Sequence, residues 1–301
     1  MSREGDASML GTDCADADSA ETDGTSSDNS LRRLESRARL FEPLTDQMFR
    51  QCGLGPGMRV LDVGCGTGDA ALLASRFVGS RGVVVGIDAS GTAVATARQR
   101  ARERGASNVT FVRGSLGQYS PAERFDAVIG RFVLMHQPDP VATVWRLATL
   151  VRDGGILAFQ EFDFTQRPLV RPELRLAVEA LQWITATLAG LGVDIGMGMR
   201  LHQTLVSAGL PRPSMLVGAA VESGADSAAC ELIGDTVSDL LEPMITLGVA
   251  TPDEVGAPTL ASRIRQAALE TDAVIVSPYI VSAWTRVQRR PTGDLELAET
   301  S

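Results

Sequence analysis

The sequence contains no lysine and only two histidines. All 28 of its basic residues are arginine, against 37 acidic residues, so the chain carries a formal net charge of −9. Eight of the acids but only one arginine fall within residues 1–30, so the rest of the chain is nearly neutral. Because no basic stripe is present, nucleic acid is not an expected partner. The two histidines, His136 and His202, are too few for a multi-histidine metal centre.

Cysteine is also scarce, and long apolar runs are missing. The four cysteines are scattered and include no C-x-x-C pair, so we expect reduced thiols and neither disulfides nor a zinc site. No apolar run reaches the roughly 18 residues of a membrane-spanning helix. The N-terminus lacks the basic-then-apolar pattern of a secretory signal. These absences predict a cytoplasmic protein without a membrane partner.

The most informative stretch is residues 58–69, Met-Arg-Val-Leu-Asp-Val-Gly-Cys-Gly-Thr-Gly-Asp. Its apolar residues Val60, Leu61 and Val63 are typical of a buried parallel strand. Three glycines then follow at alternate positions. A turn this tight needs residues that accept positive φ and lack a Cβ, and it lets a ligand lie against the backbone. The dinucleotide fingerprint G-x-G-x-x-G would need glycine at position 69, where the chain has Asp69.

Strand and helix patterns alternate through residues 58–164. This alternation predicts an α/β fold with a doubly wound parallel sheet, whose ligands bind at the carboxyl ends of the strands. Thr67 and Asp69 are the candidate caps of the first helix. The predicted strands cover 60–63, 83–88, 109–112, 125–130 and 154–162, and the predicted helices cover 68–77, 91–104 and 139–151.

The flanking segments differ in character from this core. Residues 1–30 predict a disordered acidic leader. Residues 31–57 predict two short helices interrupted at Pro43. Residues 165–301 predict helices that cap the site and strands over 215–221 and 273–287 that complete the sheet.

The motif D-x-G-x-G-x-G, with Asp62 two residues before Gly64, resembles motif I of the class I S-adenosylmethionine (SAM) dependent methyltransferases. The resemblance covers about residues 31–162. Within the class, the chain is similar to the ubiquinone/menaquinone-biosynthesis methyltransferases. It implies a Rossmann-like seven-stranded sheet with strand 7 antiparallel, N-terminal lid helices and a helical cap insertion. For the N-terminal helices, simple packing on the sheet is the alternative that stays open.

The same resemblance implies SAM as cofactor, S-adenosylhomocysteine as product and no metal. Asp88, at the end of the second strand, would hold the ribose hydroxyls. Ser115 departs from the usual Asp at the adenine amino group, and the backbone of Leu116 would share that contact. Arg131 would meet a carboxylate of the cofactor or the substrate. The full set of implied cofactor-binding residues is Asp62, Gly64, Cys65, Gly66, Asp88, Ala89, Gly114, Ser115, Leu116 and Arg131.

His136 and Glu161 are the candidates for a catalytic base, which is needed only if the acceptor arrives protonated. The pKa of a histidine suits base catalysis near pH 7. The alternative for His136 is that it hydrogen-bonds its own loop and orients Pro138. Glu161 ends a predicted strand, where it would face the substrate or serve the cofactor loop.

The resemblance therefore implies methyl transfer from SAM to a small organic acceptor, aromatic or a secondary metabolite, chiefly by proximity and orientation. The identity of the acceptor, the methylated atom and assembly as a homodimer stay open. Two other hypotheses remain. One is a SAM-binding protein that does not methylate. The other is an interaction protein whose acidic tail matters most.

Overall fold

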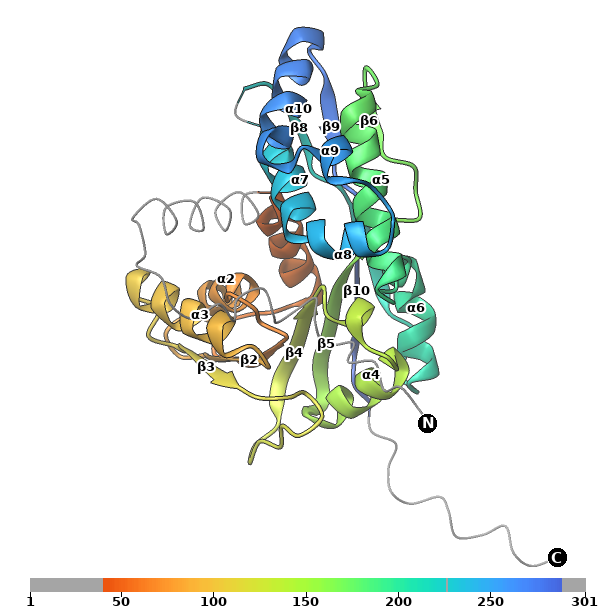
Figure 1. Ribbon diagram of the computed structural model, residues 1–301. Helices are drawn as coiled ribbons and strands as arrows, with labels where there is room; N and C mark the ends of the chain where they lie inside the picture. Colours follow the sequence, from red (N-terminus) through yellow and green to blue (C-terminus); the bar gives the residue numbers. More distant parts are fainter. Residues whose placement is uncertain (1–39, 226, 289–301) are drawn as a thin grey trace, which may run out of the picture.

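The computed structural model describes residues 40–225 and 227–288 (Figure 1). The predicted acidic leader, the first part of the predicted N-terminal helices and residues 289–301 lie outside the described residues. Seven strands form one sheet in the order β3-β2-β1-β4-β5-β10-β7. They are β1 (Arg59–Val63), β2 (Val83–Asp88), β3 (Val109–Arg113), β4 (Phe125–Arg131), β5 (Val151–Asp163), β7 (Ser214–Gly218) and β10 (Tyr279–Arg286).

Neighbouring strands of this sheet are parallel wherever β10 is not involved. The pairs β3–β2, β2–β1, β1–β4 and β4–β5 are parallel, whereas β10 is antiparallel to both β5 and β7. The predicted α/β fold, with a seven-stranded sheet whose last strand is antiparallel, is therefore confirmed. The strand order reverses at β1 and β4, which is where doubly wound sheets bind ligands.

Helices cover both faces of the sheet and give each face an apolar core. On one face lie α2 (Asp69–Val78), α3 (Gly91–Glu103) and the helical residues 40–52. On the other face lie α4 (Pro140–Thr149) and α6 (Met197–Ser207). Successive strand residues feed opposite cores, as Val128 and Ile129 of β4 do.

Two local predictions about helix boundaries are wrong. Residues 40–52 form one helix, without the expected break at Pro43. Helix α2 begins after Gly68 with no side-chain cap. Asp69 does not cap the helix because its carboxylate pairs with Arg100, at 2.6 Å.

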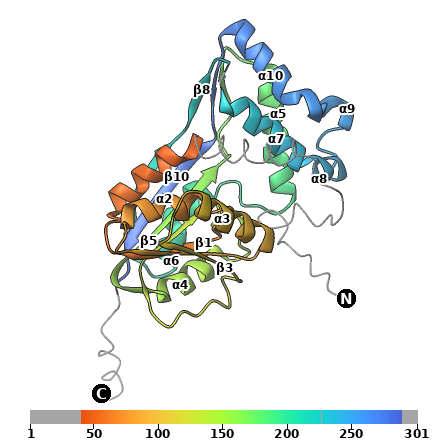
Figure 2. The ribbon, with the colours of Figure 1, turned by 90° about the vertical axis from the view of Figure 1, so that its left-hand side faces the viewer.

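A second unit rises above the sheet (Figures 1 and 2) and has its own apolar core. We call it the cap. Its small antiparallel sheet has the order β6-β9-β8. The cap consists of β6 (Leu169–Arg171), α5 (Arg175–Gly190), β8 (Val221–Ser223), α7 (Ala228–Asp239), α8 (Leu241–Thr246), α9 (Pro252–Val255), α10 (Ala257–Thr271) and β9 (Val274–Val276).

The predicted last strand, 273–287, is in fact two strands that belong to different sheets. The chain leaves β9 of the cap, turns at Ser277 and Pro278, and enters the main sheet as β10. Pro278 cannot donate a ladder hydrogen bond, and the N–H of Ser277 donates to the carbonyl of Ala220, at 2.9 Å. The alternation of apolar residues continues across this break, so the sequence pattern gives no sign of it. In the described part of the chain, no helix combines the length and apolar character that a membrane crossing requires.

Candidate active site

A cavity of about 540 Å³ opens where β1, β2, β3 and β4 end at their carboxyl termini. We call it the cofactor cavity. Every residue of the predicted cofactor-binding set lines it, and so does His136. These residues are Asp62, Gly64, Cys65, Gly66, Asp88, Ala89, Gly114, Ser115, Leu116 and Arg131. The structure thus brings together residues that are up to 74 positions apart, from Asp62 to His136, at one edge of the sheet.

The glycine turn after β1 forms the floor of this cavity. Gly64, Gly66 and Gly68 all have positive φ values, of 61°, 50° and 87°. A Cβ on Gly64 would lie 2.6 Å from a methyl carbon of Val133, so the turn can pack against the β4 loop only without a side chain there. A Cβ on Gly66 would meet nothing within 4 Å. At that position glycine serves the backbone conformation.

Asp88 ends β2 and ties the glycine turn to the start of α3. Its Oδ2 accepts a hydrogen bond from the N–H of Gly66, at 2.8 Å, and its Oδ1 accepts from the N–H of Ser90, at 2.9 Å. The side chain is buried but lines the cofactor cavity. Each carboxylate oxygen can accept more than one hydrogen bond. Asp88 is therefore held rigidly while it keeps the capacity to bind a ligand diol.

Asp62 is a buried acid in the floor of the same cavity. It is 1 % exposed, and its Oδ2 has no hydrogen-bond partner. Burial raises its pKa to about 7, with the positive charge of Arg131 acting in the opposite direction. A buried carboxylate oxygen that lacks a partner and lines a cavity is suited to a cationic ligand group.

Arg131, at the end of β4, belongs to a polar network around Asp69. One of its guanidinium nitrogens lies 3.4 Å from Oδ2 of Asp69. Arg100, reaching in from α3, pairs with Oδ1 of Asp69 at 2.6 Å and donates to the carbonyl of Thr67, at 2.6 Å. The pairing of Asp69 with Arg100 was missed in the sequence, because the two residues are 31 positions apart and Arg100 belongs to no recognisable motif.

A second cavity, of about 260 Å³, lies between the sheet and the cap. We call it the acceptor cavity. It is mostly apolar, and its walls come from the helical residues 40–52, the ends of β4 and β5, and the cap helices α5 and α7. Phe132 and His136 line both cavities. These two residues therefore mark where the acceptor cavity borders the cofactor cavity.

Phe132 has a backbone conformation that is unusual for a bulky residue, with φ of 60°. This conformation carries a steric cost for any residue with a Cβ. Its ring stacks on Phe162, with centroids 4.0 Å apart and an angle of 9° between the planes. The N–H of Phe132 donates to the carbonyl of Gln160, at 2.8 Å. The stacking and the hydrogen bond hold the strained residue at the border of the two cavities.

His136 ends the short 3-10 helix η1 (Leu134–His136), which begins two residues after Phe132. Burial lowers its pKa below the usual value, so its imidazole is neutral at pH 7. A neutral imidazole has one nitrogen that accepts a proton. Its position and protonation state suit a proton acceptor that faces both cavities.

Glu161 of β5 lines neither cavity, so of its two expected roles the geometry fits service to the loop better than a position facing the substrate. Its Oε1 accepts hydrogen bonds from the N–H groups of Val133 and Leu134, at 2.9 and 2.7 Å, and its Oε2 accepts from Met135, at 3.4 Å. The residue is fully buried. Burial raises its pKa to about 7, while the three N–H groups act to lower it. Glu161 thus holds the loop that carries Phe132 and His136.

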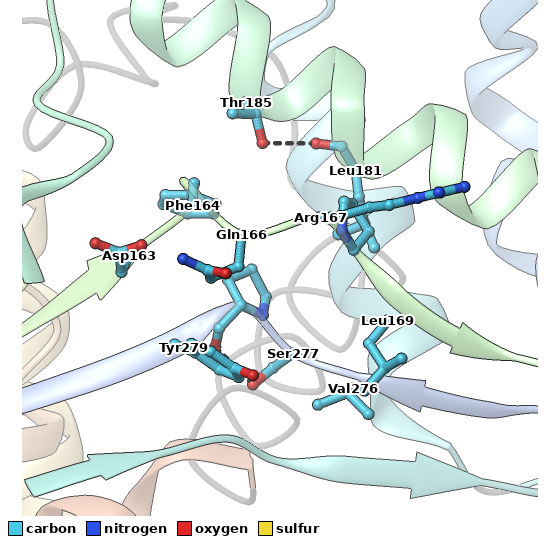
Figure 3. Close-up of a pocket in the computed structure, with 12 residues that line it drawn as sticks. Asp163, Phe164, Gln166, Arg167, Leu169, Leu181, Thr185, Val276, Ser277 and Tyr279 are labelled. Atoms are coloured by element: carbon cyan, nitrogen blue, oxygen red, sulfur yellow. Dashed lines mark hydrogen bonds between the residues drawn. The ribbon is translucent and has the colours of Figure 1, made fainter. Parts of the chain in front are cut away.

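A smaller cavity, of about 40 Å³, lies beside the acceptor cavity where the chain passes between the sheet and the cap (Figure 3). The two cavities share five lining residues, which are Phe164, Leu181, Val276, Ser277 and Pro278.

Among the residues that the structure describes, no group of three or more His, Cys, Asp or Glu side chains is arranged to hold a metal ion.

The strand order, the glycine turn and the acid at the end of β2 together define the fold of class I SAM-dependent methyltransferases. The sequence model of the family described as "Methyltransferase domain" matches residues 54–206, about half of the chain. The chain therefore belongs to this family, and membership implies SAM as the cofactor.

The curated relatives match over shorter stretches than the family model does. Aklanonic acid methyltransferase DauC of Streptomyces sp. (strain C5) is 39% identical over 120 residues, which are 39% of this chain and 54% of the relative. The 2-phytyl-1,4-naphtoquinone methyltransferase of Synechococcus elongatus is 35% identical over 118 residues, which are 38% of this chain and 51% of the relative. The chain thus spans about half the length of the curated relatives it matches.

Solved structures share the fold over more of the chain. The YcgJ protein of Bacillus subtilis superposes with a TM-score of 0.52 at 18% identity, covering 80% of this chain and 97% of the other. A protein from Bacillus halodurans C-125 gives a TM-score of 0.54 at 18% identity, covering 81% of this chain and 99% of the other. At such identities the likeness concerns the fold alone.

Proposed function

We propose that this protein binds SAM in the cofactor cavity and transfers its methyl group to a small organic acceptor in the acceptor cavity. The observation that carries the proposal is the shared border of the two cavities at Phe132 and His136. A donor in one cavity and an acceptor in the other would meet there, and such placement is the main requirement of a displacement reaction.

The side chains that line the cofactor cavity fit the groups of SAM. The unpartnered Oδ2 of Asp62 suits the ammonium of its methionine part, and the guanidinium of Arg131 suits the carboxylate. Asp88 suits the ribose hydroxyls. Ser115 and the backbone of Leu116 lie after β3, where the adenine would be bound.

When bound, SAM supplies a methyl group already activated by a sulfonium charge. The task of the protein is then to orient the acceptor, exclude water and remove the acceptor's proton if it has one. The phenylalanine rings at the border exclude water, and His136 takes the proton at its unprotonated ring nitrogen. The buried Glu161 holds the loop that presents both groups.

We infer that the acceptor is aromatic. Aromatic side chains line the acceptor cavity, and two curated relatives are named as methyltransferases of aklanonic acid and of a naphthoquinone. The direct test of the proposal is a substitution that removes cofactor binding and keeps the fold. Asp88 is the residue to change.

Replacement of Asp88 by alanine should weaken SAM binding by about 10- to 100-fold, because hydrogen bonds to a charged group contribute roughly 1.5–3 kcal/mol. Calorimetric titration of SAM and S-adenosylhomocysteine into wild type and Asp88→Ala measures this loss. Asp46→Ala is the control, since among the described residues Asp46 pairs with the exposed Arg50 on the helix of residues 40–52 and does not line the cofactor cavity. Binding of NADH without binding of SAM or S-adenosylhomocysteine would contradict the proposal. Binding of SAM without a mass shift on any acceptor would favour a binding protein that does not methylate.

Binding of SAM should release a proton from Asp62. The pKa of this acid is about 7 without ligand, and a nearby ammonium favours the charged form and lowers it. Release should approach one proton per site at about pH 6 and vanish above about pH 8, where Asp62 is already ionised. Calorimetry in two buffers of different ionisation enthalpy counts the protons. Asp62→Asn should abolish the release while Asp46→Asn keeps it. Proton uptake by the wild type at pH 6 would contradict the placement of the ammonium at Asp62.

A further inference from the structure

We call the cavity of about 40 Å³ beside the acceptor cavity the side cavity. A volume of about 10–15 Å³ already holds one water-sized group, so the side cavity has room for a substituent of about two or three non-hydrogen atoms and not for a ring. The side cavity and the acceptor cavity share five lining residues. A ligand in the acceptor cavity can therefore place a small substituent in the side cavity.

Thr185 of α5 presents a hydroxyl whose single proton is already used. Its Oγ1 donates to the carbonyl of Leu181, one helical turn back, at 2.8 Å (Figure 3). A carbonyl cannot donate, so the hydroxyl must be the donor of this bond. A hydroxyl oxygen also has two lone pairs, and among the described residues none donates to Oγ1 of Thr185. Toward the side cavity, Thr185 is thus a hydrogen-bond acceptor and not a donor.

Ser277, in the turn between β9 and β10, has used its proton in the same way. Its Oγ donates to the carbonyl of Pro278, at 3.0 Å. The same oxygen accepts from the N–H of Ala220, also at 3.0 Å. One lone pair of Ser277 is left for a ligand. The two hydroxyls that line the side cavity from α5 and from this turn therefore both call for a donor.

The other polar side chains of the side cavity do not supply a buried donor. Asp163, at the end of β5, accepts hydrogen bonds from the N–H groups of two neighbours, at 3.1 and 3.2 Å. Gln166, Arg167 and Tyr279 can donate, but all three are exposed and so remain in contact with water. Arg167 pairs with an acid of the cap at 3.2 Å and extends away from the cavity in Figure 3. A ligand group that only accepts would find its donors at the exposed end alone.

We propose that the side cavity is a subsite for a hydroxyl substituent of the acceptor, which donates its proton to Oγ1 of Thr185. A methoxy or carbonyl oxygen in the same place would set lone pair against lone pair and would displace water without replacing its hydrogen bond. The side cavity shares no lining residue with the cofactor cavity among those described. The hydroxyl held by Thr185 is therefore distinct from the atom that is methylated.

The subsite rests on the proposed function for the identity of its ligand as the methyl acceptor, but binding alone tests it. 2,6-Dihydroxynaphthalene has two equivalent hydroxyls, whereas 6-methoxy-2-naphthol has one. Only the diol can donate to Thr185 and to His136 at the same time. Each probe is titrated calorimetrically at pH 7.5 into the full chain, with and without saturating S-adenosylhomocysteine. The diol should bind about tenfold more tightly than the ether. Equal or tighter binding of the ether, or binding of neither probe, would overturn the proposal.

Variants at Thr185 assign the preference to its hydroxyl. Thr185→Val keeps the shape of the side chain and removes the acceptor, so the preference for the diol should shrink to less than about threefold. Thr185→Ser restores the hydroxyl and should restore the preference. Thr271→Val is the matched control, because the hydroxyl of Thr271 donates in the same way to the carbonyl of Ala267, at 2.7 Å, at an exposed position of α10. An unchanged preference in Thr185→Val would contradict the subsite.

A mass-shift assay with SAM separates the subsite from the proposed function. If the preference for the diol depends on Thr185 but the diol gains no methyl group, methyl transfer to it fails and the subsite stands. If the diol is methylated and Thr185→Val leaves its binding unchanged, the subsite fails and methyl transfer stands.

Discussion

Replacement of His136 by glutamine should lower kcat for methyl transfer to a hydroxyl acceptor by about 10²- to 10⁴-fold, the usual contribution of a positioned proton acceptor. Glutamine keeps a polar side chain of similar reach but accepts no proton. KM for SAM should change little, because the cofactor cavity keeps the lining groups proposed to hold SAM, at Asp62, Asp88 and Arg131. Steady-state kinetics on the acceptor identified by mass shift measures both constants.

The pH profile separates catalysis from structure. Because burial lowers the pKa of His136, the neutral form persists below the usual value of about 6.5, and activity should fall only on further acidification. This acid limb should disappear in His136→Gln. His202→Gln is the matched control, since His202 is the only other histidine and is exposed on α6. An unchanged kcat in His136→Gln would show that His136 only hydrogen-bonds its loop.

Replacement of Glu161 by glutamine should lower kcat by roughly tenfold or more and destabilise the fold by about 1–3 kcal/mol, the cost of leaving a buried donor without its acceptor. The carboxylate accepts from three consecutive N–H groups. An amide offers one acceptor oxygen, and its NH₂ group would face a donor. The loop that carries Phe132 and His136 should therefore loosen. Thermal unfolding and kinetics together measure the two effects.

This variant also distinguishes a positioning residue from a general base. If Glu161 acts through the loop, Glu161→Gln keeps the acid limb of the pH profile and lowers kcat at every pH. If Glu161 is itself the base, the limb vanishes with it. Glu103→Gln, at an exposed position of α3, is the control for the amide substitution. Loss of the limb in Glu161→Gln but not in His136→Gln would reverse the roles proposed for the two residues.

Much of the core of this site could be predicted because its signals are local. The spacing of the three glycines, the apolar run before them and the acid at the end of the next strand are all read within residues 58–88. Parallel strands then bring their carboxyl ends to one edge whatever the details of packing. Where the sequence departs from the family pattern, at Ser115, the residue still lines the same cavity.

The parts that could not be predicted depend on contacts between distant residues. The strands of the cap sheet have three residues each and come from three separate segments, so no periodicity reveals them. The four phenylalanines that line the acceptor cavity, Phe41, Phe132, Phe162 and Phe164, come from segments more than a hundred positions apart. The sequence left the choice between the two roles of Glu161 open, because a side chain at the end of a strand can face either side of the sheet. The N–H groups of the neighbouring loop determine which side it faces.

The central claim is that donor and acceptor meet at Phe132 and His136. A crystal structure with S-adenosylhomocysteine and the acceptor identified by mass shift tests it most directly. The account predicts the sulfur of the product at the border of the two cavities, with the accepting atom of that compound about 3–4 Å from it and within hydrogen-bond reach of His136. A sulfur that points away from His136, or an acceptor bound outside the acceptor cavity, would contradict the account.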